Sequence, residues 1–204
     1  SEAEKKITAY HEAGHALVSS VLPYADPVHK VSIIARGRAG GYTLKLPLED
    51  RKLQSRKEFL DDIAVTLGGY ITELMLFGDI TTGPSNDLQV VSALARDMVT
   101  KYGMSDKLGP IAFETLLGRI GNRGVHEEKE YSQKVGDAID VEVSKIVTEA
   151  YKRAEEILVK HRPALDAIAA KLIEVETLEQ EEYEKVIIAF GIMPKKKKDI
   201  EHQK

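Results

Sequence analysis

Residues 7–23 read ITAYHEAGHALVSSVLP, and His11 and His15 stand four positions apart within this stretch. Apolar residues recur through it at helical spacing, and a proline ends it, so the pattern predicts an α-helix. Residues four apart lie on one face of a helix, so both imidazoles can bind a single metal ion. Glu12, beside the first histidine, can reach a water molecule on that ion. Two ligands and a general base on one helical turn are typical of zinc proteases.

The alternative is that the two histidines are ordinary residues of an amphipathic helix. That alternative accounts neither for Glu12 nor for Gly14, which costs the helix about 1 kcal/mol relative to alanine. A glycine in the middle of a helix indicates the close approach of another element or a ligand. We therefore favour a metal site.

The composition excludes several kinds of protein. The chain has 204 residues and a net charge of −4, so it has no electrostatic signature of nucleic-acid binding, and we expect no nucleic-acid partner. It contains no cysteine, which excludes disulfides, thiolate zinc sites and a cysteine nucleophile. No apolar run approaches the roughly 18 to 20 residues that span a bilayer, so we expect this chain itself to be soluble.

The remaining pattern predicts a mainly α fold with a small β-hairpin close to the histidine helix. The hairpin strands are expected at 28–34 and 42–46, around a glycine-rich turn. Further helices are expected at 55–77, 88–102, 132–161, 163–174 and 177–191. Ser55 and Glu58 form a capping box for the first of these helices, and Thr177 and Gln180 are expected to cap the last one.

We predict one domain over residues 1–191, divided near residue 130. Residues 1–130 would form a metal-binding half, and residues 131–191 a helical bundle. A loop at 118–128 lacks periodicity and is expected to be mobile. Residues 192–204 are expected to be a charged, disordered tail.

A catalytic zinc typically has three protein ligands, so a third must lie elsewhere in the chain. In the metzincin pattern the glycine and the third histidine would fall at Val18 and Val21, so that pattern fails. The thermolysin layout needs a glutamate on a nearby downstream helix, but the stretch that follows is predicted as strands. The third ligand is therefore expected to be distant in sequence.

Three further histidines are weak candidates for that ligand. His29 lies on a predicted strand, His126 in the predicted mobile loop, and His161 at the end of a long helix, where a capping role is expected. Glu73 and Asp87 are stronger candidates. Glu73 lies among apolar neighbours, where a buried carboxylate needs a partner, and Asp87 lies at a helix start, where capping is the alternative. These arguments do not separate the two acids.

Several longer motifs resemble the peptidase domain of the FtsH family of membrane-anchored AAA+ zinc proteases, peptidase family M41. After HEAGH come VHKVSIIARGRAGG, LGGYITELMLFG, TTGPSNDL and MVTKYGMSDKLGP, and later DVEVSKIVTEAYKRAEEIL and HRPALDAIAAKLIEVETL. The resemblance covers residues 3–191, in the family's order. It implies that Asp87 is the third zinc ligand and that Glu73 supports a ligand histidine through a hydrogen bond. The chain departs from the family's GGRxAEE at residues 68–74, which read GGYITEL.

The resemblance also implies a function. We expect a zinc-dependent endopeptidase with one Zn²⁺ per chain, in which Glu12 is the general base. Its substrates would be unfolded or membrane-extracted polypeptides, delivered by an upstream AAA+ ATPase module that alone uses ATP, because this chain has no P-loop motif. Family members form hexamers anchored in the cell membrane, with this domain on the cytoplasmic side and the membrane segments upstream.

Two alternatives remain at this point. One is a zinc-bearing assembly module without useful peptidase activity, and the other is a helical domain without metal. An intact Glu12 favours the peptidase. One strand of the predicted hairpin would offer its edge to an extended substrate, which suits a protease that accepts many sequences.

Overall fold

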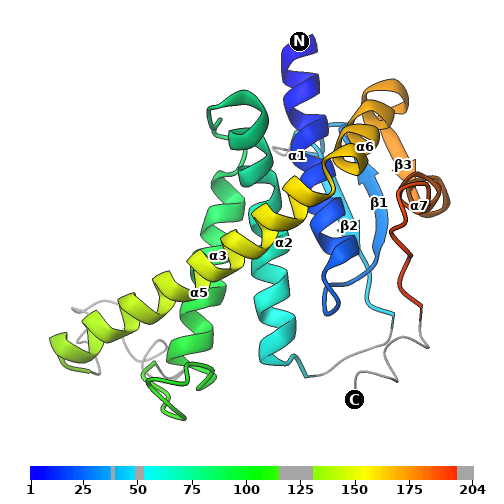
Figure 1. Cartoon of the computed structure of the whole chain (residues 1–204). Coiled ribbons are helices and arrows are strands. Elements are labelled where there is room, and N and C mark those ends of the chain that lie inside the picture. Colours follow the sequence, from blue (N-terminus) through cyan, green and yellow to red (C-terminus); the bar gives the residue numbers. More distant parts are fainter. Residues whose placement is uncertain (38–39, 49–52, 115–130, 197–204) are drawn as a thin grey trace.

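The computed structural model describes residues 1–37, 40–48, 53–114 and 131–196. In these ranges the chain is mainly helical with one small sheet, as predicted (Figure 1). The helices are α1 (Glu2–Val21), α2 (Arg56–Phe77), α3 (Ser85–Thr100), α5 (Gln133–Lys160), α6 (Arg162–Val175) and α7 (Gln180–Ile188). The strands are β1 (Val28–Ser32), β2 (Tyr42–Lys45) and β3 (Thr177–Glu179).

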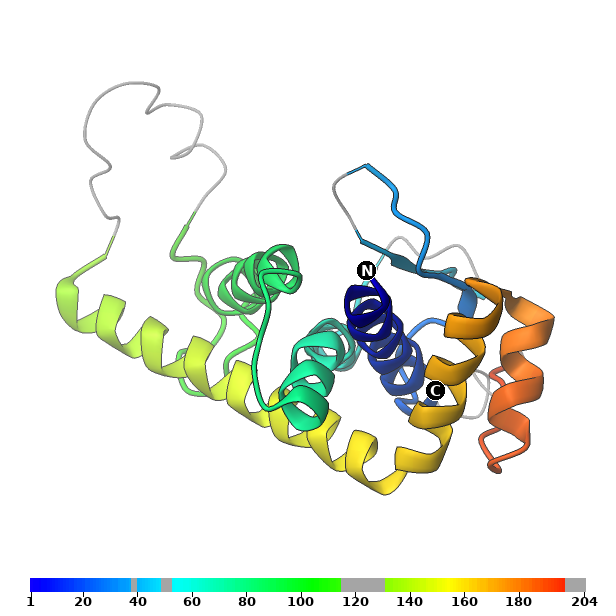
Figure 2. The same cartoon turned by 90° about the horizontal axis from the view of Figure 1, so that it is seen from above.

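The histidine helix α1 lies at the centre of the molecule. It packs against α2 on one side and against α6 and the sheet on the other. The long helix α5 crosses α2 and α3 and leads into α6, which returns to α1 (Figure 2). A single cluster of buried apolar side chains draws on all six of these helices. The division near residue 130 stays a prediction, because residues 115–130 lie outside the described ranges.

Helices α1 and α2 approach closely where two glycines face each other. A Cβ atom on Gly14 would lie 2.6 Å from the Gly68 carbonyl oxygen and would overlap the Thr72 hydroxyl. A Cβ on Gly68 would lie 2.9 Å from the Gly14 carbonyl oxygen. Real Cβ atoms do not tolerate such separations from backbone, so the crossing requires both glycines. This is the close approach that Gly14 predicted.

The ends of the predicted helices agree with their capping signals. The Ser55 hydroxyl accepts from the Glu58 N–H, and the Glu58 carboxylate accepts from the Ser55 N–H at 2.6 Å, which completes the capping box of α2. Gly78 ends the same helix in the left-handed conformation, with φ of 65°. His161 is the C-cap of α5, as expected.

The sheet has three strands rather than the two of the predicted hairpin. The strand order is β2-β1-β3, and both pairs are antiparallel. The expected cap at Thr177 is wrong, because Thr177 opens β3 and its hydroxyl is 2.9 Å from the Ser32 hydroxyl. Glu176, at φ of 63°, turns the chain from α6 back toward β1. In this order β1 is paired on both sides, and in the described part of the chain β2 and β3 are the edge strands, each paired on one side only.

The segment after α7 returns to the body of the molecule. Ile192 is buried, and the Lys195 ammonium donates hydrogen bonds to the carbonyl oxygens of Ser19 and Ala25. The described part of the predicted tail, residues 192–196, therefore makes specific contacts. Residues 197–204 lie outside the described ranges, as does the loop predicted at 118–128.

None of the described helices combines the length and the apolar character needed to cross a bilayer.

Candidate metal centre

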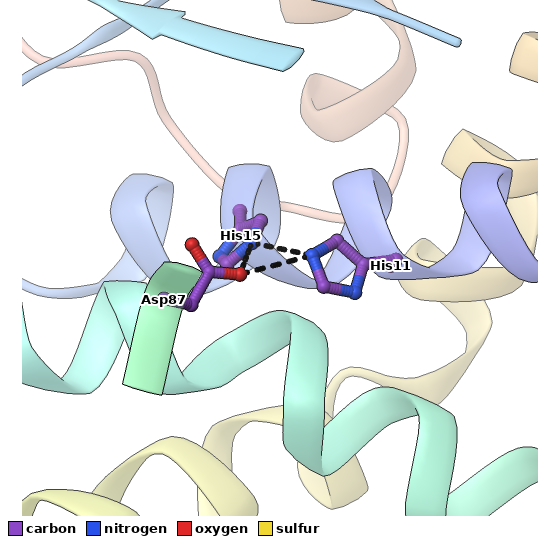
Figure 3. A group of neighbouring side chains, drawn as sticks. All are labelled: His11, His15 and Asp87. Carbon is purple, nitrogen blue, oxygen red and sulfur yellow. Dashed lines mark hydrogen bonds and ion pairs between the residues drawn. The ribbon is translucent and has the colours of Figure 1, made fainter. Parts of the chain in front are cut away.

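Three side chains from two helices converge at one point. His11 and His15 project from α1, and Asp87 reaches them from the first turn of α3 (Figure 3). The Nε2 atoms of the two histidines are 3.0 Å apart, and Asp87 Oδ2 lies 3.1 Å from the first and 3.2 Å from the second. A tetrahedral Zn²⁺ with bonds of about 2.0–2.1 Å would hold its ligand atoms about 3.3 Å apart. The three atoms therefore fit one face of a zinc coordination tetrahedron.

The position of Asp87 argues against its alternative role as a helix cap. The N-cap residue of α3 is Pro84, and the helix has no side-chain cap hydrogen bond. The Asp87 carboxylate instead faces the two imidazoles. The Asp87 side chain is 24% exposed, so solvent can reach the site formed by His11, His15 and Asp87.

Glu73 lies behind His11 on the side away from Asp87. Its Oε1 accepts a hydrogen bond from His11 Nδ1 at 3.0 Å, and its Oε2 accepts from the Thr81 backbone N–H at 3.0 Å. The Thr81 hydroxyl adds a bond to the same carboxylate. This orients the His11 ring so that Nε2 faces Asp87, which is how a carboxylate supports a ligand histidine. Glu73 is 1% exposed, and the structure gives it the partners that its burial requires.

His15 is oriented by backbone rather than by an acid. Its Nδ1 donates to the Val65 carbonyl oxygen at 2.8 Å, which leaves Nε2 directed at Asp87. With a metal bound, both imidazoles would therefore have the same tautomer, with the proton on Nδ1 and the lone pair of Nε2 directed at the ion.

Gly69 provides the space for the His11 ring. A Cβ atom at this position would lie 2.5 Å from both Cε1 and Nε2 of His11. The Gly68-Gly69 pair of α2 therefore has two functions: the first glycine allows the helices to approach, and the second accommodates an imidazole.

In the absence of metal, the charged forms of the histidines and of the two carboxylates stabilise one another. Burial opposes the charged form of His11, but hydrogen bonds to Asp87 and Glu73 outweigh burial and raise the pKa of His11 to about 9. Burial would raise the pKa values of Glu73 and Asp87, but the bonds from the histidines, and for Glu73 from Thr81, hold both below their ordinary range. A metal ion must displace the proton from His11, so binding of the ion would release it.

Glu12 lies on α1 between the metal-facing histidines and the sheet. It is 7% exposed, and its Oε2 accepts a hydrogen bond from the Thr43 hydroxyl at 2.8 Å. The helical period gives this carboxylate a direction different from that of His11 and His15, toward β2.

The other predicted ligands lie apart from this cluster. Among the described residues, only His11, His15 and Asp87 are grouped closely enough to hold a metal ion. His29 lies on β1 and His161 joins α5 to α6. His126 lies outside the described residues.

Three supporting residues were not identified from the sequence: Val65, Thr81 and Thr43. Val65 acts through its carbonyl oxygen, which every residue has, so no side-chain pattern marks it. Thr81 and Thr43 are polar residues of a turn and a strand, where polar residues are common. Only the three-dimensional arrangement shows what their hydroxyls contact.

Comparison with known proteins is consistent with this arrangement. The family model for peptidase family M41 matches residues 1–186. The chain is 52% identical over 186 residues to the ATP-dependent zinc metalloprotease FtsH 1 of Sphaerobacter thermophilus, which covers 90% of this chain and 28% of that protein. It is 50% identical over 193 residues to the ATP-dependent zinc metalloprotease FtsH of Pseudothermotoga lettingae, with 92% of this chain and 30% of that protein covered.

A third relative, the ATP-dependent zinc metalloprotease FtsH of Thermotoga maritima, is 48% identical over 193 residues, with 92% of this chain and 31% of that protein covered. The chain thus spans less than a third of the length of these relatives. The match to the family model extends over most of the chain and includes the histidine helix and Asp87. The chain belongs to peptidase family M41.

Proposed function

We propose that this chain is a zinc-dependent endopeptidase domain, in which His11, His15 and Asp87 hold one Zn²⁺ and Glu12 is the general base. The observation that carries the proposal is the triangle of ligand atoms, with sides of 3.0, 3.1 and 3.2 Å, beside a carboxylate on the same helical turn. Two imidazole nitrogens and one carboxylate oxygen are suitable ligands for a catalytic zinc ion, which keeps a fourth position for water or substrate.

A bound zinc ion would lower the pKa of its water ligand and polarise the carbonyl of the peptide bond to be cleaved. The protein supplies the movement of protons. Glu12 accepts a proton from the attacking water and then delivers it to the leaving nitrogen, so that one carboxylate serves as base and acid in turn. Glu73 and the Val65 carbonyl keep the two imidazoles in position while this happens.

The exposed edge of β2 is the proposed docking site for substrate. In the described part of the chain, β2 pairs on one side only, with β1, and it lies against α1 beside Glu12. An extended peptide that added to this edge would be held through its main chain, largely independently of its sequence. Such binding suits a protease that degrades unfolded polypeptides of many kinds.

We propose that the whole protein couples this domain to an ATPase. Relatives of which this chain covers less than a third are named ATP-dependent zinc metalloproteases, and the chain has no P-loop motif of its own. In this proposal an upstream AAA+ module delivers unfolded or membrane-extracted polypeptides to a homo-hexamer. Upstream segments anchor the protein in the cell membrane, with this domain on the cytoplasmic side.

The first test is metal analysis of the purified chain, followed by proteolysis of an unfolded protein such as casein. We expect about one zinc per chain and cleavage that a chelator abolishes and added zinc restores. Glu12→Gln should keep the zinc and lose the cleavage. Zinc without cleavage in the unaltered chain would favour the assembly module, absence of metal would overturn the site, and strong cleavage by Glu12→Gln would overturn the assignment of the base.

A further inference from the structure

The general base is held by the edge strand as well as by its own helix. The Thr43 hydroxyl on β2 donates to Glu12 Oε2 at 2.8 Å and lies 3.3 Å from the Glu12 backbone carbonyl oxygen. A hydroxyl has one proton, so the shorter, carboxylate-directed bond is the principal one. Within the described part of the chain, Glu12 Oε1 has no hydrogen-bond partner. One carboxylate oxygen is therefore fixed and the other is available.

Gly41 brings the strand to this distance. A Cβ atom on Gly41 would lie 3.0 Å from Glu12 Cγ and 2.7 Å from the Ser32 carbonyl oxygen. The start of β2 is therefore fitted closely around the glutamate side chain, with a glycine against its methylene groups and a threonine hydroxyl at its carboxylate. The contact joins residues 31 positions apart, so it reflects packing of the strand on the helix and not a local turn.

We propose that Thr43 is a positioning residue for the general base, an inference that rests on the proposed function. The Glu12 side chain has three rotatable bonds, and each unproductive rotamer takes the carboxylate away from the reacting water. The Thr43 hydroxyl stabilises the Glu12 rotamer in which Oε2 accepts its hydrogen bond. Oε1 then remains to accept the proton of the attacking water. Thr43 acts through Glu12, and among the described residues its hydroxyl makes no hydrogen bond to His11, His15 or Asp87.

The same residue connects the base to the substrate edge. Thr43 faces Val31 in the antiparallel register of β1 and β2, so its backbone is part of the sheet while its side chain holds Glu12. A peptide docked on the edge of β2 would therefore lie on the strand that positions the catalytic carboxylate. The distance between substrate and base would be set by one strand and not by the sum of several flexible contacts.

The kinetic test compares Thr43→Val, which removes the hydroxyl at nearly constant size, with Thr43→Ser, which keeps it. With a fluorogenic peptide, we expect Thr43→Val to lower kcat about tenfold with KM within about twofold of the original value, and Thr43→Ser to restore most of kcat. Zinc content should be unchanged in both. Thr100→Val is the matched control, because its buried hydroxyl donates to the Arg96 carbonyl oxygen and lies 3.4 Å from Glu114 Oε2, far along α3 from Asp87.

A readout independent of activity uses the metal-free protein. Thermal unfolding is measured for Thr43→Val, for Glu12→Ala and for the double variant. We expect Thr43→Val to lower the midpoint in the original background and to have little effect in the Glu12→Ala background, because its partner is then absent.

The outcomes separate this inference from the proposed function. If the unaltered chain cleaves peptide and Thr43→Val retains its full kcat, the positioning role is wrong. It is equally wrong if Thr43→Ser fails to restore kcat, if zinc is lost, or if the two unfolding effects simply add. If the unaltered chain binds zinc but cleaves nothing, the proposed function fails, and the unfolding cycle still decides whether Thr43 holds Glu12.

Discussion

His11 contacts both acids of the site, so it is the side chain at which their roles can be distinguished. Asp87 meets the Nε2 atom that faces the metal position, whereas Glu73 meets Nδ1 on the opposite side of the ring. We propose the first acid as a ligand and the second as its support. The loss of a ligand should then weaken zinc binding far more than the loss of the support, which typically weakens it about 10- to 100-fold.

The first prediction compares Asp87→Ala with Glu73→Ala in a zinc competition titration against a chelator. Asp87→Ala should retain almost no zinc after dialysis, because two imidazoles alone leave the ion incompletely coordinated. Glu73→Ala should bind zinc with an affinity lowered by about 10- to 100-fold. Circular dichroism of both variants controls for folding. Full zinc in Asp87→Ala together with its loss in Glu73→Ala would show that the two roles are reversed.

The ligand spacing on α1 could be predicted from the sequence, but the third ligand could not. The helical period alone places His11 and His15 on one face. Asp87 reaches that face only because α3 packs on α2 and α2 packs on α1, and these contacts depend on many side chains far apart in sequence. Arguments from single residues therefore left Glu73 and Asp87 undecided, and the family resemblance favoured Asp87.

At the scale of the helices, the glycines at the crossing of α1 and α2 set the distance between these two helices. The second prediction is that Gly14→Ala destabilises the protein by roughly 1–3 kcal/mol, since its methyl group would meet the Gly68 carbonyl oxygen at 2.6 Å. Urea unfolding measures the change. The matched control is Gly136→Ala in α5, where the nearest atom is a Tyr131 ring carbon at 3.4 Å.

That control should be neutral or more stable by up to about 1 kcal/mol, because alanine is the better helix former. Two equal destabilisations would mean that close approach at Gly14 has no special importance. The comparison separates the helix propensity of glycine, which both positions share, from the packing that only Gly14 provides.

The helices were predicted well because their signals are local. The capping box of α2 and its C-terminal glycine lie within a few residues of the ends that they define. Strand β3 was missed for the opposite reason. Its three residues are too short for an alternating pattern, Thr177 and Gln180 have the spacing of a capping box, and its partner β1 lies about 145 positions earlier in the chain.

At the scale of the whole molecule, an ion pair between a buried carboxylate and a half-exposed arginine holds α5 across α2. Asp61 Oδ1 accepts from Arg153 Nη1 at 2.8 Å, its Oδ2 accepts from the Tyr24 backbone N–H at 2.8 Å, and Arg153 Nη2 also donates to the Leu60 carbonyl oxygen. The Asp61 side chain is 3% exposed, while that of Arg153 is 41% exposed. The carboxylate thus joins three separate parts of the fold.

The third prediction is that Asp61→Asn lowers the free energy of unfolding by roughly 2 kcal/mol, a value reduced for the partial exposure of Arg153. The control is Asp106→Asn, which breaks the exposed pair with Arg56 and should leave the free energy of unfolding nearly unchanged. Urea titration of both variants gives the comparison. Similar small changes in both would show that the Asp61 pair contributes no more than a surface contact.

The fourth prediction concerns the pH dependence of the C-terminal contact. Burial lowers the pKa of Lys195 to about 8, against the partial opposition of Asp61 and Asp26. The unfolded chain therefore binds more protons between pH 8 and the ordinary lysine pKa of about 10.4, and this group makes folding more favourable as the pH rises through that window.

The measurement is the difference in unfolding free energy between the original chain and Lys195→Met from pH 7 to pH 10.5. The difference should shift in favour of the original chain as the pH rises, and the subtraction removes the titration of other lysines and tyrosines. A difference that is flat over this range would show that the Lys195 ammonium is not desolvated in the folded protein.

The strand order β2-β1-β3 also has a consequence for the time at which the protease becomes complete. The metal-facing residues end at position 87, but β3 spans residues 177–179. A two-stranded hairpin alone is marginally stable in water. During synthesis the ribosome therefore releases the metal-binding residues well before it releases the strand that completes the sheet. A nascent chain would therefore carry its zinc residues while the sheet that contains β2, the proposed substrate edge, still lacks its third strand.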